Sequence, residues 1–597
     1  MKTTYLITFI IILFTNIVYP NWIPRKENNK NANICDKLDE YVYSPYSEEQ
    51  FLKYSDIKAC YELTSYNKTK AIQLIETVKE YLKGFYALLD QAKEDPNPGF
   101  ALRPIDLISE LDLVLKNNYS YEYQFIYDVA SLIEELRDGH TALRSNDYYK
   151  YTFDQGLSMY SVIKEDGTQQ IKVFNDIKEP SNVDCQVIDI DGKPAIDAII
   201  EFARDHTFNS RDLSARFNSA LASLAFGNGD FDIAGQLFTY RNQLPKNPSI
   251  SYTLNCNGTF FKITREWQVP IKNVQYKSPY ISGTSVGNAT LIFDAFIARF
   301  YILQDFGVVL ISTEDINNSG DLEYHFLSNI IAGFKLFADK GIKKIILDLS
   351  NNGGGDVFIG HYINKLLFPN IQNFPLDYKV NDISIPFIKE ISRIKNRIGD
   401  IFHYKSFLSA NTKSSFDIVN DFIGNNIYTR GGVKVRYTSK AFLNDTTNYI
   451  GTFELPKPPK FPWTEKDIVI LTNGFCQSSC AIITQRLAEI NVLTIAVGGF
   501  PNTRFSFAQY AVGGAYSSAE IQPLLKLKNI NSSLVSKLSL PSNLTLHFTL
   551  AEAYSIKNPN EVMDFAYRPA DYQLYYDERS ARDPSCLWIQ AAEYFGK

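Results

Sequence analysis

The sequence has few of the side chains that hold metals and cofactors. It contains six histidines in 597 residues, and no two of them are close together. Among seven cysteines, the one close pair has no second pair nearby, whereas a structural zinc site needs four ligands at short spacings. The glycine-rich stretches match neither Gly-x-Gly-x-x-Gly nor a P-loop with its lysine. We therefore expect no metal and no cofactor.

Concentrated charge and long apolar runs are also missing. Sixty basic and sixty-six acidic side chains give a net charge of −6, with no long run of either sign. Nucleic-acid binding relies on a concentrated positive surface, so we expect no nucleic-acid partner. Beyond the N-terminus, no segment reaches the roughly 20 consecutive apolar residues of a membrane span. With 45% hydrophobic residues, the chain has ample apolar surface for a folded protein.

The first 20 residues have the build of a secretory signal peptide. Lys2 precedes an apolar stretch over residues 5–18 that is too short to span a membrane. Eight glycosylation sequons agree with that route, at Asn67, Asn118, Asn257, Asn288, Asn317, Asn444, Asn531 and Asn543. We expect a secreted or lumenal glycoprotein.

The cysteines fall into three groups along the chain. The groups are Cys35 with Cys60, Cys185 with Cys256, and Cys476, Cys480 and Cys586. In an oxidising compartment they suggest disulfides within each segment and one thiol left over. In the last group three arrangements stay open: a local bridge between Cys476 and Cys480, two buried thiols, or pairing of one of them with Cys586.

The pattern of the sequence changes along the chain and predicts three folded regions. Residues 34–150 have apolar side chains at helical spacing and predict a helical N-terminal region. Residues 151–274 consist of short β-rich runs with a hairpin turn before a helix, as in PDZ-like modules. Residues 275–590 alternate strands and helices and predict an α/β domain, interrupted by an insertion at about 369–462. Inside the insertion, the isoleucine spacing predicts an amphipathic helix over residues 387–402.

Three short segments contain residues suited to chemistry. In DIVILTNGFCQSSCA, Ser478 lies in the turn between a strand and a helix, whose free amides favour developing negative charge. Gly354 belongs to a triple glycine after the strand IILDLSNN, and such amides can form half of an oxyanion hole. His140 ends a DGH turn and is a natural general base for a serine. Each also has a structural interpretation: a helix N-cap, a flexible turn and a surface histidine.

In combination, these motifs resemble the tail-specific, or C-terminal-processing, serine peptidase family. The resemblance rests on LDLSNNGGG, NGFCQSSCA and VGGFPNTRFSFAQYAVGG. With the DGH element, QVIDIDGKPA and DFAYRPADYQLYY, it is closest to the secreted fungal branch related to the chlamydial protease-like activity factor. It implies a multidomain α/β protein with a crotonase-like (ClpP-type) catalytic domain, and a peptide or protein as substrate.

The resemblance also implies roles for individual residues. Ser478 matches the nucleophile and His140 the general base, while the amides of Ser479 and Gly354 match the oxyanion hole. The tail-specific branch uses a lysine base shortly after its serine. This sequence has Arg504 at the matching point, and a permanently charged arginine cannot accept the proton. A serine and lysine dyad is therefore not expected.

A carboxylate toward the C-terminus would orient the histidine in this family branch. Asp571 is the preferred candidate, with Glu561 and Asp564 as alternatives. Arg568 stands where fungal relatives often carry a glutamate. Two functions remain: a secreted serine endopeptidase, or a catalytically inactive binding protein on the same fold that takes an apolar ligand or a peptide.

Overall fold

The structure is a computed structural model. It describes residues 33–43, 50–207, 210–227, 229–271, 283, 285–316, 320–397, 399–444, 449–450, 453–454, 459–508 and 514–596. The expected signal peptide, residues 1–20, lies outside the described residues. In the described ranges no helix has the length and apolar character needed to cross a membrane.

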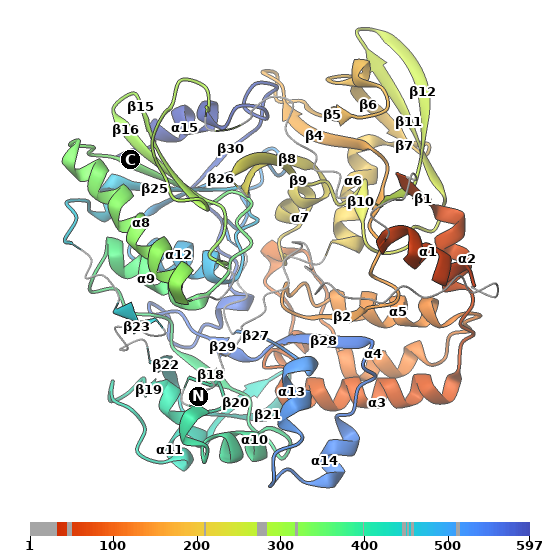
Figure 1. Ribbon diagram of the computed structural model, residues 1–597. Coiled ribbons are helices and arrows are strands. Elements are labelled where there is room, and N and C mark those ends of the chain that lie inside the picture. Colours follow the sequence, from red (N-terminus) through yellow and green to blue (C-terminus); the bar gives the residue numbers. More distant parts are fainter. Residues whose placement is uncertain are drawn as a thin grey trace.

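A seven-stranded sheet forms the centre of the C-terminal half (Figure 1). In sheet order, its strands are β14 (Thr290–Asp294), β15 (Ala298–Leu303), β16 (Phe306–Ile311), β17 (Ile345–Asp348), β25 (Ile468–Thr472), β26 (Leu493–Val497) and β30 (Tyr572–Leu574). The strands from β16 to β30 pair in parallel, and β14 and β15 extend the sheet antiparallel. The runs IILDL and DIVIL thus form neighbouring parallel strands, as an α/β layer requires. The expected multidomain α/β class is confirmed.

Helices cover both faces of this sheet. They are α8 (Gly320–Asp339), α9 (Val357–Leu367) and α12 (Ser478–Glu489) on one face and α15 (Pro584–Ala592) on the other. Successive strand residues alternate between the two cores, since Ile345 packs in the cluster that contains Ile482 of α12 and Ile346 in the one that contains Trp588 of α15. Burial on both faces explains why the strand sequences are continuously apolar.

Helices build the N-terminal region, and one strand ties it to the C-terminus. The helices are α1 (Ile34–Tyr43), α2 (Tyr54–Tyr61), α3 (Lys68–Phe85), α4 (Leu107–Val114) and α5 (Glu122–Glu134). The strand β2 (Ala142–Ser145) pairs with β28 (Leu544–Thr549), which also pairs with β27 (Ala515–Ser517). Helices α13 (Ser518–Leu524) and α14 (Ser532–Lys537) connect those two strands. The N-terminal region and the segment over residues 515–549 therefore share one small sheet.

The next region is a β-rich module with one long helix. Its main sheet follows the order β12 (Thr259–Glu266), β11 (Ser249–Cys256), β6 (Gln186–Ile190), β5 (Gln169–Asp176) and β4 (Leu157–Ile163), with β7 (Lys193–Pro194) beside β6. Helices α6 (Ala195–His206) and α7 (Leu213–Ala220) pack in its core. A second sheet has the order β1 (Phe51–Lys53), β13 (Gln268–Pro270), β3 (Phe153–Asp154) and β10 (Tyr240–Arg241), and β8 (Ala222–Gly227) and β9 (Asp230–Gly235) form a separate hairpin.

The insertion has its own elements and docks on a C-terminal strand. They are β18 (Leu376–Tyr378), α10 (Ser384–Ile391), β19 (Phe407–Ser409), α11 (Val419–Ile423), β20 (Asn426–Arg430), β21 (Val433–Tyr437), β22 (Ala441–Leu443), β23 (Tyr449–Ile450) and β24 (Phe453–Glu454). Strand β18 pairs with β29 (Ala551–Ala553). The helix predicted over 387–402 is wrong in extent: α10 ends at Ile391, and Ile394 is only half-buried, so the apolar face does not continue.

Three disulfides lie within the segments that the sequence suggested. They join Cys35 to Cys60, Cys185 to Cys256, and Cys476 to Cys480, while Cys586 is a free thiol. Of the three arrangements open for the last group, the local bridge is the one present. Each bridge links residues of the same region, so none of them holds two regions together.

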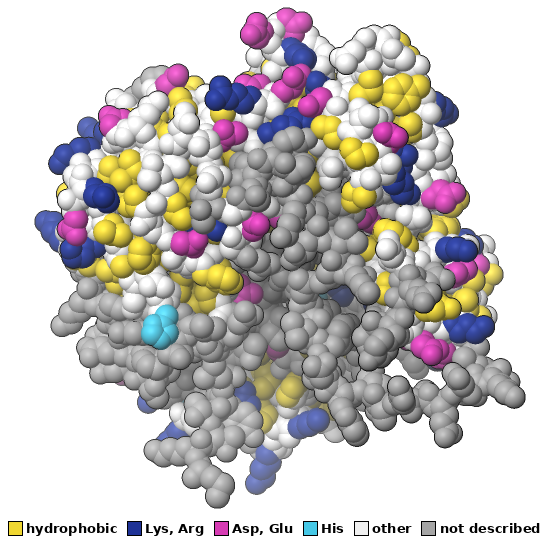
Figure 2. Space-filling model, turned by 45° about the horizontal axis from the view of Figure 1, so that its top comes forward, with side chains coloured by type: hydrophobic (Ala, Val, Ile, Leu, Met, Phe, Trp, Pro, Cys, Tyr) yellow, Lys and Arg dark blue, Asp and Glu magenta, His cyan; other side chains and the backbone are white. Residues whose placement is uncertain are grey.

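Charged side chains of both signs are interspersed over the described part of the face shown in Figure 2. Exposed pairs such as Arg103 with Glu110 (2.7 Å) contribute only about 0–1 kcal/mol each. The fold therefore depends on its apolar cores.

One buried hydrogen bond in the central domain provides a stability test. Trp588 Nε1 donates to the buried carboxylate of Asp348 at 2.7 Å, which joins α15 to β17. Trp588→Phe removes this donor and should lower the free energy of unfolding by about 1–3 kcal/mol. Ile589→Ala on the exposed side of the same helix should change it by about 0.5 kcal/mol or less. Urea unfolding measures both, and equal effects would contradict the expectation.

Candidate active site

Ser478 is the first residue of α12 and follows the sharp turn after β25. Its backbone has φ of +51°, a conformation that is uncommon for a residue other than glycine. Such a turn places a serine at the N-terminus of the helix, where free amides and the helix dipole stabilise negative charge. Ser478 is only 2% exposed. A residue with a strained backbone persists only when the surrounding structure holds it in place. The contacts of Ser478 with its neighbours therefore maintain this conformation.

A disulfide closes the turn around Ser478. Cys476 and Cys480 flank the serine on either side, are both fully buried, and have Cα atoms 5.3 Å apart. The bridge therefore forms a small covalent ring that contains Gln477, Ser478 and Ser479. This ring restricts the backbone that aims the serine hydroxyl.

The glycine loop after β17 packs directly on the turn. A Cβ added at Gly354 would lie 2.6 Å from the carbonyl oxygen of Gln477 and 2.7 Å from Ser478 Cβ, so only glycine fits there. The Gly354 N–H donates to Asn352 Oδ1 at 2.8 Å. This amide is thus engaged within its own turn, and its expected role as an oxyanion donor stays a prediction. Gly354 also permits the close approach of two loops.

The loop that carries His140 lies against the same turn. A Cβ added at Gly139 would lie 3.4 Å from Gln477 Nε2, so this loop contacts the residue before Ser478. Strand β2 begins at Ala142, two residues after His140, and pairs with β28. The fold therefore brings a histidine of the N-terminal region to the neighbourhood of a serine of the C-terminal half.

Asp138 organises the turn that ends in His140. Its carboxylate accepts hydrogen bonds from the His140 N–H (3.0 Å), the Thr141 hydroxyl (2.7 Å) and the Thr549 hydroxyl (2.8 Å). The imidazole is buried, and neither of its nitrogens has a hydrogen-bond partner among the described residues. Burial lowers the pKa of His140, and the negative charge of Asp138 opposes that shift. The environment thus favours neutral imidazole, the form that can accept a proton.

None of the three carboxylates expected to orient His140 is bonded to it. Asp571, the preferred candidate, accepts bonds from the N–H (2.9 Å) and hydroxyl (2.8 Å) of Thr494, at the beginnings of β26 and β30. Because parallel strands share their direction, that edge of the sheet is opposite to Ser478. The prediction for Asp571 is therefore wrong.

The two alternative carboxylates differ from each other. Glu561 pairs with Arg568 at 2.6 Å and is partly exposed. Asp564 is buried, and no hydrogen-bond partner to its oxygens occurs among the described residues. Burial raises the pKa of Asp564 well above its usual range, Asp138 raises it further, and Arg211 opposes them. Of the three candidates, Asp564 is thus the one whose pKa responds to the charge of Asp138 in the DGH turn, and it makes no hydrogen bond with the imidazole.

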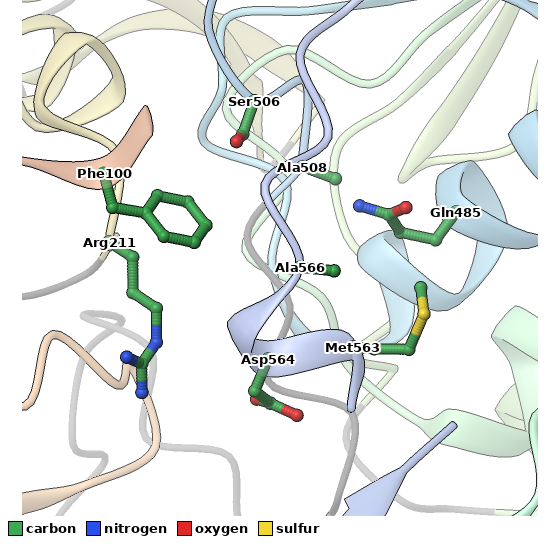
Figure 3. Close-up of a pocket in the computed structure, with 8 residues that line it drawn as sticks. All are labelled: Phe100, Arg211, Gln485, Ser506, Ala508, Met563, Asp564 and Ala566. Atoms are coloured by element: carbon green, nitrogen blue, oxygen red, sulfur yellow. The ribbon is translucent and has the colours of Figure 1, made fainter. Parts of the chain in front are cut away.

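A small pocket lies beside the helix that begins at Ser478. Its lining consists of Phe100, Arg211, Gln485, Ser506, Ala508, Met563, Asp564 and Ala566 (Figure 3). In Figure 3, Phe100 and Arg211 come from one side, and Gln485 of α12 and Met563 from the other. Gln485 is seven residues after Ser478, or about 10 Å along the helix axis. The pocket thus lies about two helical turns along α12 from the serine, where three regions of the chain meet.

Sequence reasoning missed Glu314 and Asn352. Glu314 is fully buried and accepts a hydrogen bond from the Ser479 hydroxyl at 2.8 Å and another from Asn352 Nδ2 at 2.8 Å. A signal was present, since Glu314 follows the apolar strand FGVVLI at the edge of the sheet where Ser478 lies. In the described ranges, no cluster of three His, Cys, Asp or Glu side chains could hold a metal ion.

Comparisons with known proteins agree with this architecture. A family model described as a CPAF-like PDZ domain matches residues 152–273. "Peptidase S41 family protein phomP1'" of Diaporthe leptostromiformis is 22% identical over 495 residues, which are 71% of this chain and 72% of that protein. "Peptidase S41 family protein ustP" of Aspergillus flavus is 23% identical over 301 residues, which are 42% of this chain and 61% of that protein.

A solved structure shares the overall fold. Mature CPAF complexed with lactacystin matches with a TM-score of 0.55 at 14% identity, over 88% of this chain and 97% of that one. The curated relatives that it resembles are named as S41 peptidases, which are serine-type peptidases. More particularly, the chain is a relative of the S41, or tail-specific, peptidases and has a CPAF-like PDZ domain. The resemblance predicted from its motifs is confirmed.

The close approach at Gly354 provides a second test. Gly354→Ala would place a methyl group within 2.7 Å of the Ser478 turn at a φ of +96°, so it should lower the free energy of unfolding by about 2–3 kcal/mol. Gly432→Ala is the matched control, because Gly432 has φ of +78° but nothing within 4 Å. It should cost only about 1 kcal/mol from backbone strain. Thermal or urea unfolding measures the difference, and equal losses would show that the contact is unimportant.

Proposed function

We propose that the protein is a secreted serine endopeptidase in which Ser478 is the nucleophile and His140 the general base. The observation that carries the proposal is the meeting of three loops at one point: the strained turn of Ser478, the glycine loop and the DGH turn. We further propose that the seven-stranded sheet and its helices form a crotonase-like domain. The substrate would be a peptide or a protein.

The proposed chemistry follows from the groups present. Ser478 attacks the carbonyl carbon of the peptide bond while neutral His140 takes its proton, and the histidine then protonates the leaving amine. The N–H of Ser479 is at the free N-terminus of α12 and would donate to the oxyanion. Asp138 holds the backbone of the DGH turn and adds a negative charge that favours the imidazolium formed during the reaction.

The nucleophile can be tested with a serine-reactive fluorophosphonate and with a peptide library. Ser478→Ala should abolish labelling and lower hydrolysis by about 10³-fold or more, with the free energy of unfolding changed by about 1 kcal/mol or less, because only one hydroxyl is removed. Ser158→Ala is the control, because Ser158 is also buried and its hydroxyl has no partner among the described residues. It should keep full labelling and activity.

Two results would contradict the proposal. Hydrolysis that survives in Ser478→Ala would show that another residue is the nucleophile. A folded parent protein that neither becomes labelled nor cleaves any library peptide would support the binding protein on the same fold.

The role of His140 predicts a particular pH dependence. Because burial lowers the pKa of His140 from 6.5, the imidazole loses its proton at a lower pH than an exposed histidine. The kcat/KM of the parent should therefore rise with pH along a limb below 6.5, and His140→Ala should lose both the limb and most of the activity. His206→Ala, in the PDZ-like region, should leave the profile unchanged. A limb above 6.5, or an active His140→Ala enzyme with the same profile, would exclude this role.

A further inference from the structure

Glu314 is a buried carboxyl group that the proposed reaction does not use. It follows β16, and its two oxygens accept hydrogen bonds from the Ser479 hydroxyl and from Asn352 Nδ2, each at 2.8 Å. No ion pair with a basic side chain is found for it in the described ranges. Burial raises the pKa of Glu314 to about 7, against the effect of the two hydrogen bonds. Burying a carboxyl group without an ion-pair partner lowers the stability of the fold. Its retention here suggests that its hydrogen bonds serve the neighbouring site.

The backbone of Glu314 connects to the same two loops. Its N–H donates to the carbonyl of Gly354 at 3.0 Å, and its own carbonyl accepts from the N–H of Asp356 at 3.1 Å. Asn352, which Glu314 holds, accepts from the Gly354 N–H through its side chain and from the Gln477 N–H (3.1 Å) through its carbonyl. Glu314 is thus hydrogen-bonded both to the glycine loop and to Ser479, the residue after the nucleophile.

We propose that Glu314 is a positioning residue that fixes the Ser479 amide and the glycine loop relative to Ser478. The inference rests on the proposed function, because it assigns a supporting role within that same site. The Ser479 side chain is bonded to Glu314, so the orientation of the Ser479 N–H depends on this anchor. An oxyanion donor works because it is already in place before the reaction, and a displacement of about 1 Å can cost about 10²-fold in rate.

The chemistry of the contacts predicts which substitution preserves them. In Glu314→Gln, the amide oxygen can accept from Asn352 and the amide nitrogen can donate to the Ser479 hydroxyl, since a hydroxyl both donates and accepts. In Glu314→Ala neither contact remains. The glutamine also imitates the neutral acid, a form that a pKa of about 7 makes accessible near neutral pH.

The experiment measures kcat and KM on one cleaved peptide for the full-length chain and its variants. Glu314→Ala should lower kcat by about 10²-fold and leave KM within about twofold, because the Glu314 side chain is fully buried and has no surface to offer to a bound peptide. Glu314→Gln should retain kcat within about threefold of the parent. The matched control is Glu520→Ala: Glu520 accepts from the Ser517 hydroxyl at 2.8 Å and its pKa is also raised to about 7, but it lies on α13. The control should keep the kcat of the parent.

A double-mutant comparison separates positioning from general loss of structure. Ser479→Ala removes the other end of the contact and should lower kcat by about tenfold, and Glu314→Ala combined with Ser479→Ala should resemble Glu314→Ala alone. If Glu314→Ala does not fold, Ser479→Ala and Glu314→Gln are compared with the parent instead. Unchanged kcat in Ser479→Ala, additive losses, or a Gln variant as poor as the Ala variant would overturn the proposal.

The outcome is distinguishable from failure of the proposed function. If Ser478→Ala is inactive while Glu314→Ala keeps the kcat of the parent, the peptidase assignment stands and the role of Glu314 is wrong. If Ser478→Ala keeps its activity, the assignment of the site itself has failed, and with it the inference that depends on it.

Discussion

The parallel pairing of β17 with β25 is the constraint on which the site depends. It aligns Ile345 with Ile468 and Asp348 with Leu471, so both strands end at the same edge of the sheet. The alignment continues past the strands, because the Leu349 N–H donates to the carbonyl of Leu471. A further parallel bridge joins Asn352 to Cys476. The glycine loop and the turn of Ser478 are therefore neighbours because the strands before them are. The apolar cores on both faces of the sheet stabilise this strand pairing, and the helices on each face complete those cores.

A second constraint fixes the histidine. The segment from β28 to β29 pairs with β2 of the N-terminal region and then with β18 of the insertion, so three distant parts of the chain meet along about ten residues. Thr549, at the end of β28, donates to Asp138 in the DGH turn. The position of His140 thus depends on residues more than 400 positions away in the sequence. The site can form only after the N-terminal region and the C-terminal segment have docked.

The sequence predicted the parts of the site that depend on local pattern. A serine between an apolar strand and a helix, and a glycine run after another strand, are visible in the residues themselves, and the structure contains both turns. The bridge between Cys476 and Cys480 was one of three arrangements that the sequence left open, and the structure contains it. The amphipathic helix over 387–402 failed because the isoleucine spacing continues while the burial of its face does not.

The parts that depend on distant packing could not be predicted. Asp571 was chosen because it lies in the C-terminal segment that resembles the family. The direction of β30 places it beside Thr494, at the edge of the sheet opposite to Ser478. The amide of Gly354 was expected in the oxyanion hole because the glycine run follows a strand and resembles the family motif. In the structure this amide donates a hydrogen bond to the side chain of Asn352, two residues earlier. The position of Glu314 directly after an apolar strand was visible in the sequence, but its contacts with Ser479 and Asn352 were not, because those partners belong to two other segments.

The disulfide around Ser478 has a consequence for how the protein can be made. The ring of Cys476 and Cys480 contains the serine, so the geometry of the turn depends on an oxidation step that follows synthesis of the chain. Thiols in the bacterial cytosol are kept reduced. Chains produced there would carry an open ring and a serine turn with more freedom, even if every strand and helix were in place. Expression with export to an oxidising compartment is therefore the appropriate source of protein for any measurement of this serine.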